Sequence, residues 1–253
     1  MRSRARGVAL LGAAFAALSV AAQAEEFLIL PLIGDRITVV GEQQQTGTRV
    51  DKNKSSVVTI SEPGFENAAL IAADKAIRKA RPDAMTTMLR SRDPKVYALR
   101  DSWLGTDAVD VKELLALIAG LSNSAADARL VLITPYRTEP RLKTDRDYRG
   151  TGLVAGLGFY IDGNTPMIGD NGERGIGFLG VFAHFQIVLI DLSSQAILAR
   201  ERVVAGTTFA AADAKDKNPW NALSSARKET ALIALMSREI ERVLPNMLTA
   251  RKP

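Results

Sequence analysis

The chain of 253 residues contains no cysteine and only one histidine. Without cysteine it can form no disulfide, supply no thiolate nucleophile and carry no lipid on a lipobox cysteine. A zinc site would have to rely on carboxylates, which is unusual, and His184 is the only ring that a hydrolytic triad could use. We therefore predict neither a metal nor a cofactor for this protein.

Blocks of basic residues are also absent. The chain has 33 basic and 28 acidic residues, a formal net charge of +5. Three of the basic residues are Arg2, Arg4 and Arg6, so the chain after them carries 30 basic and 28 acidic residues, a net charge of +2. Cations and acids alternate in segments such as KTDRDYR at residues 143–149. This pattern lacks the electrostatic footprint of nucleic-acid binding.

A single apolar run at the amino terminus has the features of a targeting segment. It extends from Val8 to Ala22, follows three arginines, and is short for a membrane span. The A-x-A sequence that ends at Ala24 then provides a cleavage site before Glu25. We predict a signal peptide over residues 1–24, cleaved after Ala24, and a bacterial periplasmic protein. The alternative is an uncleaved membrane anchor.

Apolar runs and helical periodicities alternate in the first half of the remaining chain, and long strand-like runs follow. Expected strands cover residues 27–33, 37–40, 57–60, 86–89, 129–135, 153–161, 176–192 and 197–204. Expected helices cover residues 65–81, 111–121 and 222–248. The alternation predicts an α/β layer with parallel pairing, and the later strands predict antiparallel hairpins.

The expected fold is therefore α/β (α+β), with a mixed β-sheet, helices packed on it, long antiparallel C-terminal hairpins and a final amphipathic helix. We expect one domain over residues 25–253, with a glycine-rich β-hairpin elaboration at residues 150–180. The apolar stripe of the final helix is expected to pack on the sheet. It comprises Leu232, Leu235, Met236, Ile240, Val243, Leu244 and Met247.

The stretch TGLVAGLG at residues 151–158 has the glycine spacing of a dinucleotide-binding turn. Such a turn needs a buried strand before it and a helix after it, whereas the flanking KTDRDYR and FYIDGNTP favour neither. No tyrosine of the chain starts a Y-x-x-x-K motif. On a strand, Gly156, Gly158 and Tyr160 would share one face and leave a smooth groove. Backbone, an aromatic ring or a ligand could approach closely there.

The strand expected at residues 176–192 has two contrasting faces. One face is wholly apolar and comprises Leu179, Val181, Ala183, Phe185, Ile187 and Leu189. The other is partly polar and contains His184 and Gln186. We expect His184 to be half-buried and hydrogen-bonded, because the sequence offers no G-x-S-x-G elbow and no evident acid partner.

A charged cluster follows the buried strand 129–135, and loops at the carboxyl ends of strands are where ligands gather in α/β sheets. This position favours a surface for a small acidic ligand or a partner protein, and the alternative is a solvated loop. Together with the glycine-bearing strand and the histidine, the candidate ligand or partner surface comprises Arg137, Arg141, Lys143, Arg146, Tyr148, Arg149, Gly156, Gly158, Tyr160 and His184.

Two segments, ADARLVLITP at residues 126–135 and FAHFQIVLIDLSSQAILARERV at residues 182–203, carry a family resemblance. Their layout resembles the anticodon-binding-like α/β domains of the curli-secretion and TolB amino-terminal type. The chain departs from that pattern in lacking a lipobox cysteine and in having the glycine-rich segment. The resemblance implies a binding or assembly module and no enzyme.

The sequence thus predicts a periplasmic, non-enzymatic binding or assembly module of the bacterial cell envelope. Its expected partner is an envelope protein or a small ligand, with no nucleic acid and with peripheral membrane association as a further possibility. The alternative from another functional class is a periplasmic hydrolase that uses a carboxylate or His184.

Overall fold

The structure, a computed structural model, describes residues 24–41, 53–106, 108–120, 127–144 and 147–249. The elements in chain order are β1 (Glu26–Pro31), β2 (Arg36–Gly41), β3 (Lys54–Thr59), α1 (Gly64–Ala80), β4 (Met85–Met88), α2 (Pro94–Ser102), the 3₁₀ helix η1 (Trp103–Gly105), α3 (Val111–Ile118), β5 (Arg129–Pro135), β6 (Arg137–Thr138), β7 (Leu142–Lys143), β8 (Tyr148–Arg149), β9 (Val154–Ile168), β10 (Arg174–Asp191), β11 (Ile197–Ala210), the 3₁₀ helices η2 (Ala211–Asp213) and η3 (Pro219–Ala222), and α4 (Ser225–Met247).

The predicted fold class is confirmed. The strands form a nine-stranded mixed sheet in the order β3-β2-β9-β10-β5-β1-β4, with β11 beside β10 and β6 beside β9. The last three long strands pair antiparallel, as expected, and a long helix ends the fold. The predicted signal peptide lies outside the described residues except for its last one, and no helix within the described ranges is long and apolar enough to cross a membrane.

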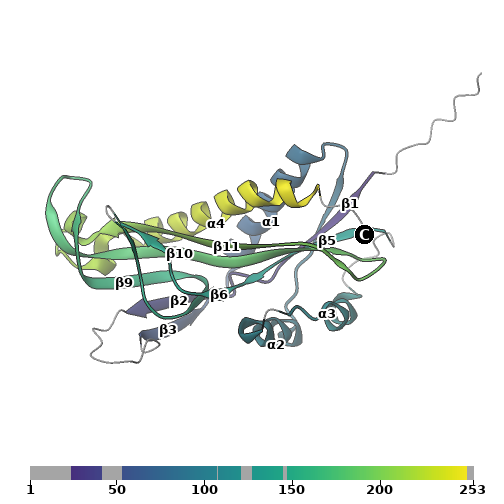
Figure 1. Cartoon of the computed structure of the whole chain (residues 1–253), viewed down its shortest axis with the longest axis horizontal. Helices are drawn as coiled ribbons and strands as arrows, with labels where there is room; N and C mark the ends of the chain where they lie inside the picture. The colour runs from purple at the N-terminus through teal and green to yellow at the C-terminus, as the bar shows by residue number, and fades with distance from the viewer. Residues whose placement is uncertain (1–23, 42–52, 107, 121–126, 145–146, 250–253) are drawn as a thin grey trace, which may run out of the picture.

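Strand β10 is the longest strand and organises the sheet (Figure 1). Along one edge it pairs with β11 from Phe178 to Ile190. Along its other edge it pairs first with β9, up to His184, and then with β5, from Phe185 onward. Strands β5 and β9 therefore lie end to end beside β10.

The next row of the sheet repeats this arrangement. Strand β1 pairs parallel with β5, and β2 pairs parallel with β9, so β1 and β2 also lie end to end, joined by residues 32–35. We call the junction between the two halves of the sheet the seam. It is formed by residues 32–35, Pro135, Gly156 and His184.

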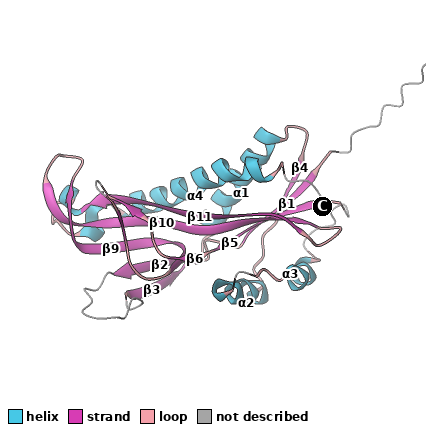
Figure 2. Ribbon diagram, in the orientation of Figure 1, coloured by secondary structure: helices cyan, strands magenta, loops and turns pink. Residues whose placement is uncertain are grey.

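Helices cover both faces of the sheet (Figures 1 and 2). Helices α1 and α4 pack on one face, where the alternating side chains Val181, Phe185 and Leu189 of β10 are buried in the main core. Helices α2 and α3 pack on the other face, over Val188 and Ile190. The predicted apolar face of β10 is confirmed, but the opposite face is buried as well because α2, α3 and the segment after β5 cover it.

Helix α4 begins after Ser224, whose hydroxyl accepts a hydrogen bond from the Arg227 amide, a usual amino-terminal cap. All seven residues of the predicted apolar stripe are buried, and the stripe joins the main core with α1. The stripe thus packs on the fold, as predicted.

Four elements differ clearly from the sequence prediction. Helix α2 was not predicted, although Asp93 caps it through the Lys95 amide and Pro94 occupies its first turn. Strand β3 begins at Lys54, three residues before the predicted start, and β11 continues to Ala210. Strand β9, expected to end at residue 161, continues through Asp162 to Ile168.

The strand continues through that segment because the buried Asp162 carboxylate accepts hydrogen bonds from the Asn164 and Thr165 amides and from the Thr165 hydroxyl. Local bonds of this kind satisfy a carboxylate without reversing the chain. The reversal between β9 and β10 comes later, at residues 169–173.

Candidate functional site

The predicted charged cluster lies on the segment that leaves β5 and returns to β9, residues 136–153. Its side chains have different environments. The Arg141 guanidinium stacks on the Tyr148 ring at 4.9 Å, and both residues lie on the outer side of the segment, with Tyr148 54 % exposed. Arg149 pairs through its backbone with Leu142, in the small sheet of β7 and β8. Arg146 lies outside the described residues.

This segment is anchored to the main sheet by Leu142, which is fully buried. The side chain lies on Gly180 of β10 and Gly206 of β11, and a Cβ atom on Gly180 would lie 2.7 Å from a Leu142 methyl group. The Lys143 carbonyl accepts a hydrogen bond from the Thr208 hydroxyl at 2.6 Å. Close approach to glycine thus lets the segment lie flat on the sheet.

The glycine-bearing face of β9 leaves no open groove at Gly158. A Cβ atom there would collide with the Thr38 carbonyl oxygen and with the Phe182 ring, which fills the space. An aromatic ring thus occupies the close-approach site that the sequence predicts. Gly156 has a positive φ of 72° and lies at the seam.

Tyr160, on the same face of β9, is fully buried. Its hydroxyl accepts a hydrogen bond from the Thr151 amide at 3.0 Å, and the Asn53 side-chain amide lies 3.4 Å away. The phenol therefore ties the end of the 136–153 segment to the sheet. This is a structural role, and it leaves the Tyr160 hydroxyl enclosed.

His184 differs from the expectation of a half-buried, hydrogen-bonded ring. It is fully buried, and neither ring nitrogen has a hydrogen-bond partner among the described residues. Burial lowers the pKa of His184 to about 4, and a polar contact with the backbone of Val154, which does not reach hydrogen-bond geometry, offsets only part of this. The ring is therefore neutral at pH 7, packed beside Phe182 at a centroid distance of 5.4 Å.

A cavity of about 230 Å³ lies on the same face of the sheet, where β5 ends. It is lined by Trp103, Leu104, Thr106, Pro135, Tyr136, Arg137 and Gln186. Three regions meet there: η1, the residues after β5, and β10. The position agrees with the general preference of α/β sheets for binding at the carboxyl ends of strands, as the sequence predicts for Arg137.

Some of the buried polar atoms without partners belong to residues in or next to the cavity wall. Within the described ranges they are the Trp103 indole nitrogen, the Thr134 hydroxyl, both His184 ring nitrogens and one atom of Asn67, which lies on α1. Trp103 lines the cavity, Thr134 faces Gln186 in the register of β5 and β10, and His184 lies two positions along β10. Leaving such a group unpaired costs about 1–3 kcal/mol.

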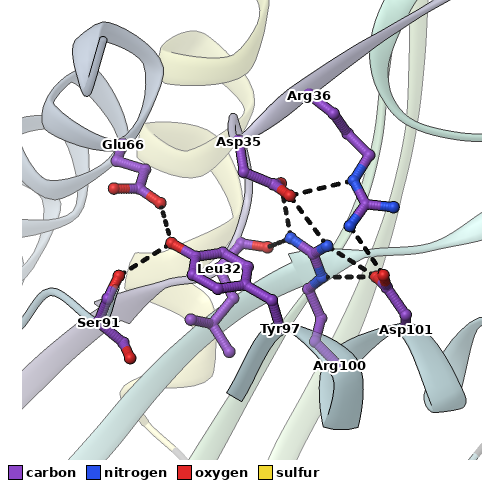
Figure 3. Close-up of polar contacts among 8 residues, drawn as sticks. All are labelled: Leu32, Asp35, Arg36, Glu66, Ser91, Tyr97, Arg100 and Asp101. Atoms are coloured by element: carbon purple, nitrogen blue, oxygen red, sulfur yellow. Dashed lines mark hydrogen bonds and ion pairs between the residues drawn. The ribbon is translucent and has the colours of Figure 1, made fainter. Parts of the chain in front are cut away.

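A second polar cluster, three residues before Trp103 in the chain, is organised in the opposite way (Figure 3). Arg100 of α2 has a side chain that is 1 % exposed. Its guanidinium donates five hydrogen bonds: two to Asp35, two to Asp101 and one to the Leu32 carbonyl. A guanidinium has five N–H groups, so every donor of Arg100 is in use.

Arg36 closes this cluster on its solvent side, where it contacts Asp35 at 3.0 Å and Asp101 at 2.7 Å. Burial would raise the pKa of Asp35, but the hydrogen bonds and charge of Arg100, with those of Arg36, hold it below its usual value. The Asp35 carboxylate is therefore ionised, and both Asp35 and Asp101 form ion pairs with Arg36 and Arg100. We call Asp35, Arg36, Arg100 and Asp101 the arginine cluster.

Beside it, the Tyr97 hydroxyl lies 2.6 Å from a Glu66 carboxylate oxygen and 3.0 Å from the Ser91 carbonyl (Figure 3). Burial raises the pKa of Glu66, although the hydrogen bond from Tyr97 opposes this. Burial and the neighbouring Glu66 also raise the pKa of Tyr97 above its ordinary value. These contacts join the first turn of α1, the segment after β4, and α2.

The arginine cluster positions the cavity. Arg100 binds the residues that connect β1 to β2, and therefore holds the carboxyl end of α2 against the seam. Trp103 directly follows α2, so these contacts also fix the position of Trp103. Arg100 has no free guanidinium donor with which to bind a ligand, whereas the Trp103 indole nitrogen has no partner among the described residues.

Of the predicted site residues, only Arg137 lines the cavity, and His184 lies on the same face of the sheet nearby. Trp103, Tyr136, Gln186 and Arg100 were not predicted. Tyr136 and Gln186 do lie at the end of a predicted strand and on the polar face of another. No feature of the sequence marks Trp103 or Arg100, because α2 was not predicted.

No family model matches the chain, and no match was found among curated proteins.

Proposed function

We propose that the protein is an exported, non-enzymatic binding module of the bacterial cell envelope that binds a small polar ligand in the cavity at the end of β5. The observation that carries this proposal is the cavity itself, which lies where β5 ends and is lined by the polar side chains of Tyr136, Arg137 and Gln186. A few polar groups in a concave site at this position would fix the orientation of a ligand.

The polar groups near the cavity favour binding over catalysis. No carboxylate of the described residues hydrogen-bonds to His184, and a neutral ring with a pKa of about 4 is a weak general base. The guanidinium of Arg100 is fully occupied by protein groups. No specific arrangement of the described side chains therefore favours the alternative, a hydrolase that uses a carboxylate or His184.

Export and the family resemblance support the assignment to the cell envelope. The signal-peptide pattern predicts that the protein recovered from the periplasm begins at Glu25. Amino-terminal sequencing tests this, and recovery from the cytoplasm with Met1 intact would contradict it. The resemblance to the curli-secretion and TolB amino-terminal type implies a binding or assembly role.

The binding proposal can be tested with Trp103 as the reporter. Trp103 and Trp220 are the two tryptophans of the chain, so Trp220→Phe leaves the indole at the cavity as the single tryptophan. This variant, residues 25–253, is titrated with neutral, cationic and anionic polar molecules: maltose, putrescine, butyrate and phosphate. We expect at least one class to give a saturable change in emission.

The matched control is Gln186→Leu in the same background, which removes a polar wall of the cavity and keeps a similar side-chain volume. The saturable change should weaken at least tenfold in this variant. No saturable response to any class, in a protein that melts cooperatively, would overturn the proposed function.

A further inference from the structure

Strand β3 lies at the outer margin of the main sheet (Figure 1). It comes last in the strand order and, among the described residues, pairs only with β2. All six of its residues, Lys54–Thr59, are exposed, and the side chains of Val57 and Val58 are 59 % and 49 % exposed. Successive residues of a strand point to opposite faces, so β3 exposes apolar side chains on both faces.

The register of β2 and β3 identifies the backbone groups that face away from the sheet. The Ile60 amide donates a hydrogen bond to the Asp35 carbonyl, one position beyond the last pair of this register. Backbone groups of an antiparallel strand alternate between its two edges, so every second residue of β3 bonds to β2. The remaining residues, Ser55, Val57 and Thr59, direct their N–H and C=O groups outward.

This edge lacks the features that usually stop a further strand from adding to a sheet. Exposed edges are commonly protected by charged residues, proline, bulges or very short strands. Residues 55–59 read SSVVT, with neither a charge nor a proline, and their register with β2 has no shift. At the other end of the strand order, β4 is protected by its length of only four residues. Strand β3 is therefore suited to pair with another strand.

We propose that β3 pairs with β3 of a second copy of this chain, antiparallel and about a two-fold axis that passes beside Val57. In this register Ser55 lies opposite Thr59 of the second copy, and Val57 lies opposite Val57 of the second copy. Outward-facing residues then meet outward-facing residues. Each outward N–H of residues 55, 57 and 59 donates to an outward C=O of the other copy, so all of these groups are satisfied.

The side chains of residues 55–59 fit this self-pairing. A β-branched pair forms at Val57, and the hydroxyl groups of Ser55 and Thr59 lie opposite each other, both of which are favourable cross-strand pairs. Because residues 55–59 carry no charge, no charged side chain meets its own copy near the axis. Two-fold dimers are the commonest soluble oligomers, and such a pairing closes without leading to fibres.

The charges that flank the uncharged stretch have opposite signs, which also favours a second copy. Lys54 precedes it and Glu62 follows it, and both residues are exposed. In the antiparallel register Lys54 lies opposite Ile60 of the second copy, two positions from Glu62 of that copy. Side chains in such a diagonal relation are within reach of each other when they are long. Each of the two ends of the paired strands therefore brings opposite charges together.

The dimer should be transient, because only the strand edge and its neighbouring side chains take part. Such an interface belongs with those smaller than about 1,200 Å² in total, which are typical of weak encounters. Strand β3 contributes no residue to the cavity, so the self-pairing does not depend on the proposed function.

Sedimentation velocity on residues 25–253 tests the self-pairing, at protein concentrations from about 1 μM to about 1 mM. We expect monomer at the lowest concentration, a growing fraction of dimer above it, and no larger species. Val57→Lys places like charges opposite each other at the axis and should weaken the dimer at least tenfold. Val57→Thr keeps an uncharged β-branched side chain and should change the dissociation constant less than threefold.

The matched control is Ile71→Lys, which changes an apolar side chain of α1 that is 63 % exposed and lies outside β3. It should leave the dissociation constant unchanged. Because Val57 and Ile71 are both exposed, all three variants should melt at the temperature of the parent chain.

The absence of cysteine from the chain permits a direct test of the register. A mixture of the Ser55→Cys and Thr59→Cys proteins should cross-link as a dimer with a short bis-maleimide reagent, because the two positions lie opposite each other between copies. Either protein alone should cross-link severalfold less. In that case the two thiols lie four residues apart along the paired strands, about 14 Å at about 3.4 Å per residue.

Three results would overturn the self-pairing. The first is a chain that stays monomeric up to about 1 mM. The second is a dimer that Val57→Lys weakens no more than Ile71→Lys does, because that dimer would use another surface. The third is cross-linking that is as strong in the single proteins as in the mixture. If the monomeric Ser55→Cys protein instead cross-links to another protein of an envelope extract, the edge of β3 pairs with a different partner.

Discussion

The arginine cluster and the cavity lie on the same face of the sheet, and Arg100 of the first is three residues before Trp103 of the second. Their buried polar groups differ in whether they have hydrogen-bond partners. Arg100 is almost inaccessible to solvent, yet each of its donors has an acceptor. Trp103 is also buried, and its indole nitrogen has none among the described residues.

The difference follows from the cost of burying each group. An isolated buried charge costs so much free energy that a fold retains it only with counterions and hydrogen bonds. A neutral indole or hydroxyl without a partner costs about 1–3 kcal/mol, which a stable fold can tolerate. A buried polar group therefore suggests a binding site only when its donors and acceptors are left without partners.

The largest effect is expected where a charge is placed in the core without a counterion or hydrogen-bond partners. Leu235 of α4 is 3 % exposed in the main core. Leu235→Asp should lower the free energy of unfolding by about 5 kcal/mol or more, comparable with the whole stability of a domain, because the carboxylate would have no partner. A thermal melt measures this. An unchanged melting temperature would instead mean that the apolar stripe of α4 docks a partner.

Removing the guanidinium of the arginine cluster should have the next largest effect. Arg100→Met leaves Asp35, Asp101 and the Leu32 carbonyl without their buried partner, and breaking such a pair costs about 3–5 kcal/mol. Urea denaturation at pH 7 measures the loss. Arg100→Lys keeps the charge but not the fork of donors, and should recover only part of the stability. An unchanged free energy of unfolding for Arg100→Met would contradict the view that the arginine cluster depends on its paired guanidinium.

The partnerless histidine should make stability depend on pH. The pKa of His184 in the folded protein is about 4, below its ordinary value of 6.5. The neutral ring therefore contributes stability above pH 6.5, and this is lost as the pH falls from 6.5 towards 4, by roughly 3 kcal/mol in total.

The measurement is urea denaturation at several pH values between 7 and 4, for the parent chain and for His184→Leu. The difference between the two isolates the histidine, because Glu66, whose pKa is raised by burial, contributes with the opposite sign in both proteins. If the free energy of unfolding changed with pH equally in the two proteins, His184 would have a partner or be accessible to water.

The smallest effect is expected at the cavity. Trp103→Phe removes a buried donor that has no acceptor, so the loss of apolar area is offset by the loss of an unsatisfied group, and stability should change by less than about 1 kcal/mol. Differential scanning calorimetry of the ligand-free protein measures this. A loss of more than about 2 kcal/mol would indicate that the indole nitrogen is already hydrogen-bonded, for example to a buried water molecule.

The sequence could predict those elements whose burial is periodic. The alternation along β10 assigns Val181 and Phe185 to the main core, and the helical stripe of α4 does the same for Leu235, because periodic burial leaves a periodic pattern. Helix α2 has a weak pattern, with Val96, Leu99 and the charged Arg100 as its buried residues. Its apolar content is too low to reveal a buried face, although Asp93-Pro94 is a usual helix start.

The candidate site shows the same division. Arg137 could be predicted because it follows a buried strand, and the carboxyl end of such a strand is a general position for binding. Trp103 could not, because it reaches the cavity only through the contacts that Arg100 makes with residues 32–35, more than sixty positions away. The Gly158 face could not be judged either, since Phe182 on a neighbouring strand fills it.

The sequence by itself determined one buried face of β10, the buried stripe of α4, the mixed α/β class, and the lack of thiol chemistry, because periodicity and composition are local properties of the chain. Only the tertiary structure decided that Arg100 is neutralised while Trp103 and His184 lack partners. The pairing of a buried donor depends on which distant segments reach it, and here the seam between the two halves of the sheet brings acceptors to α2 and leaves a cavity beside it.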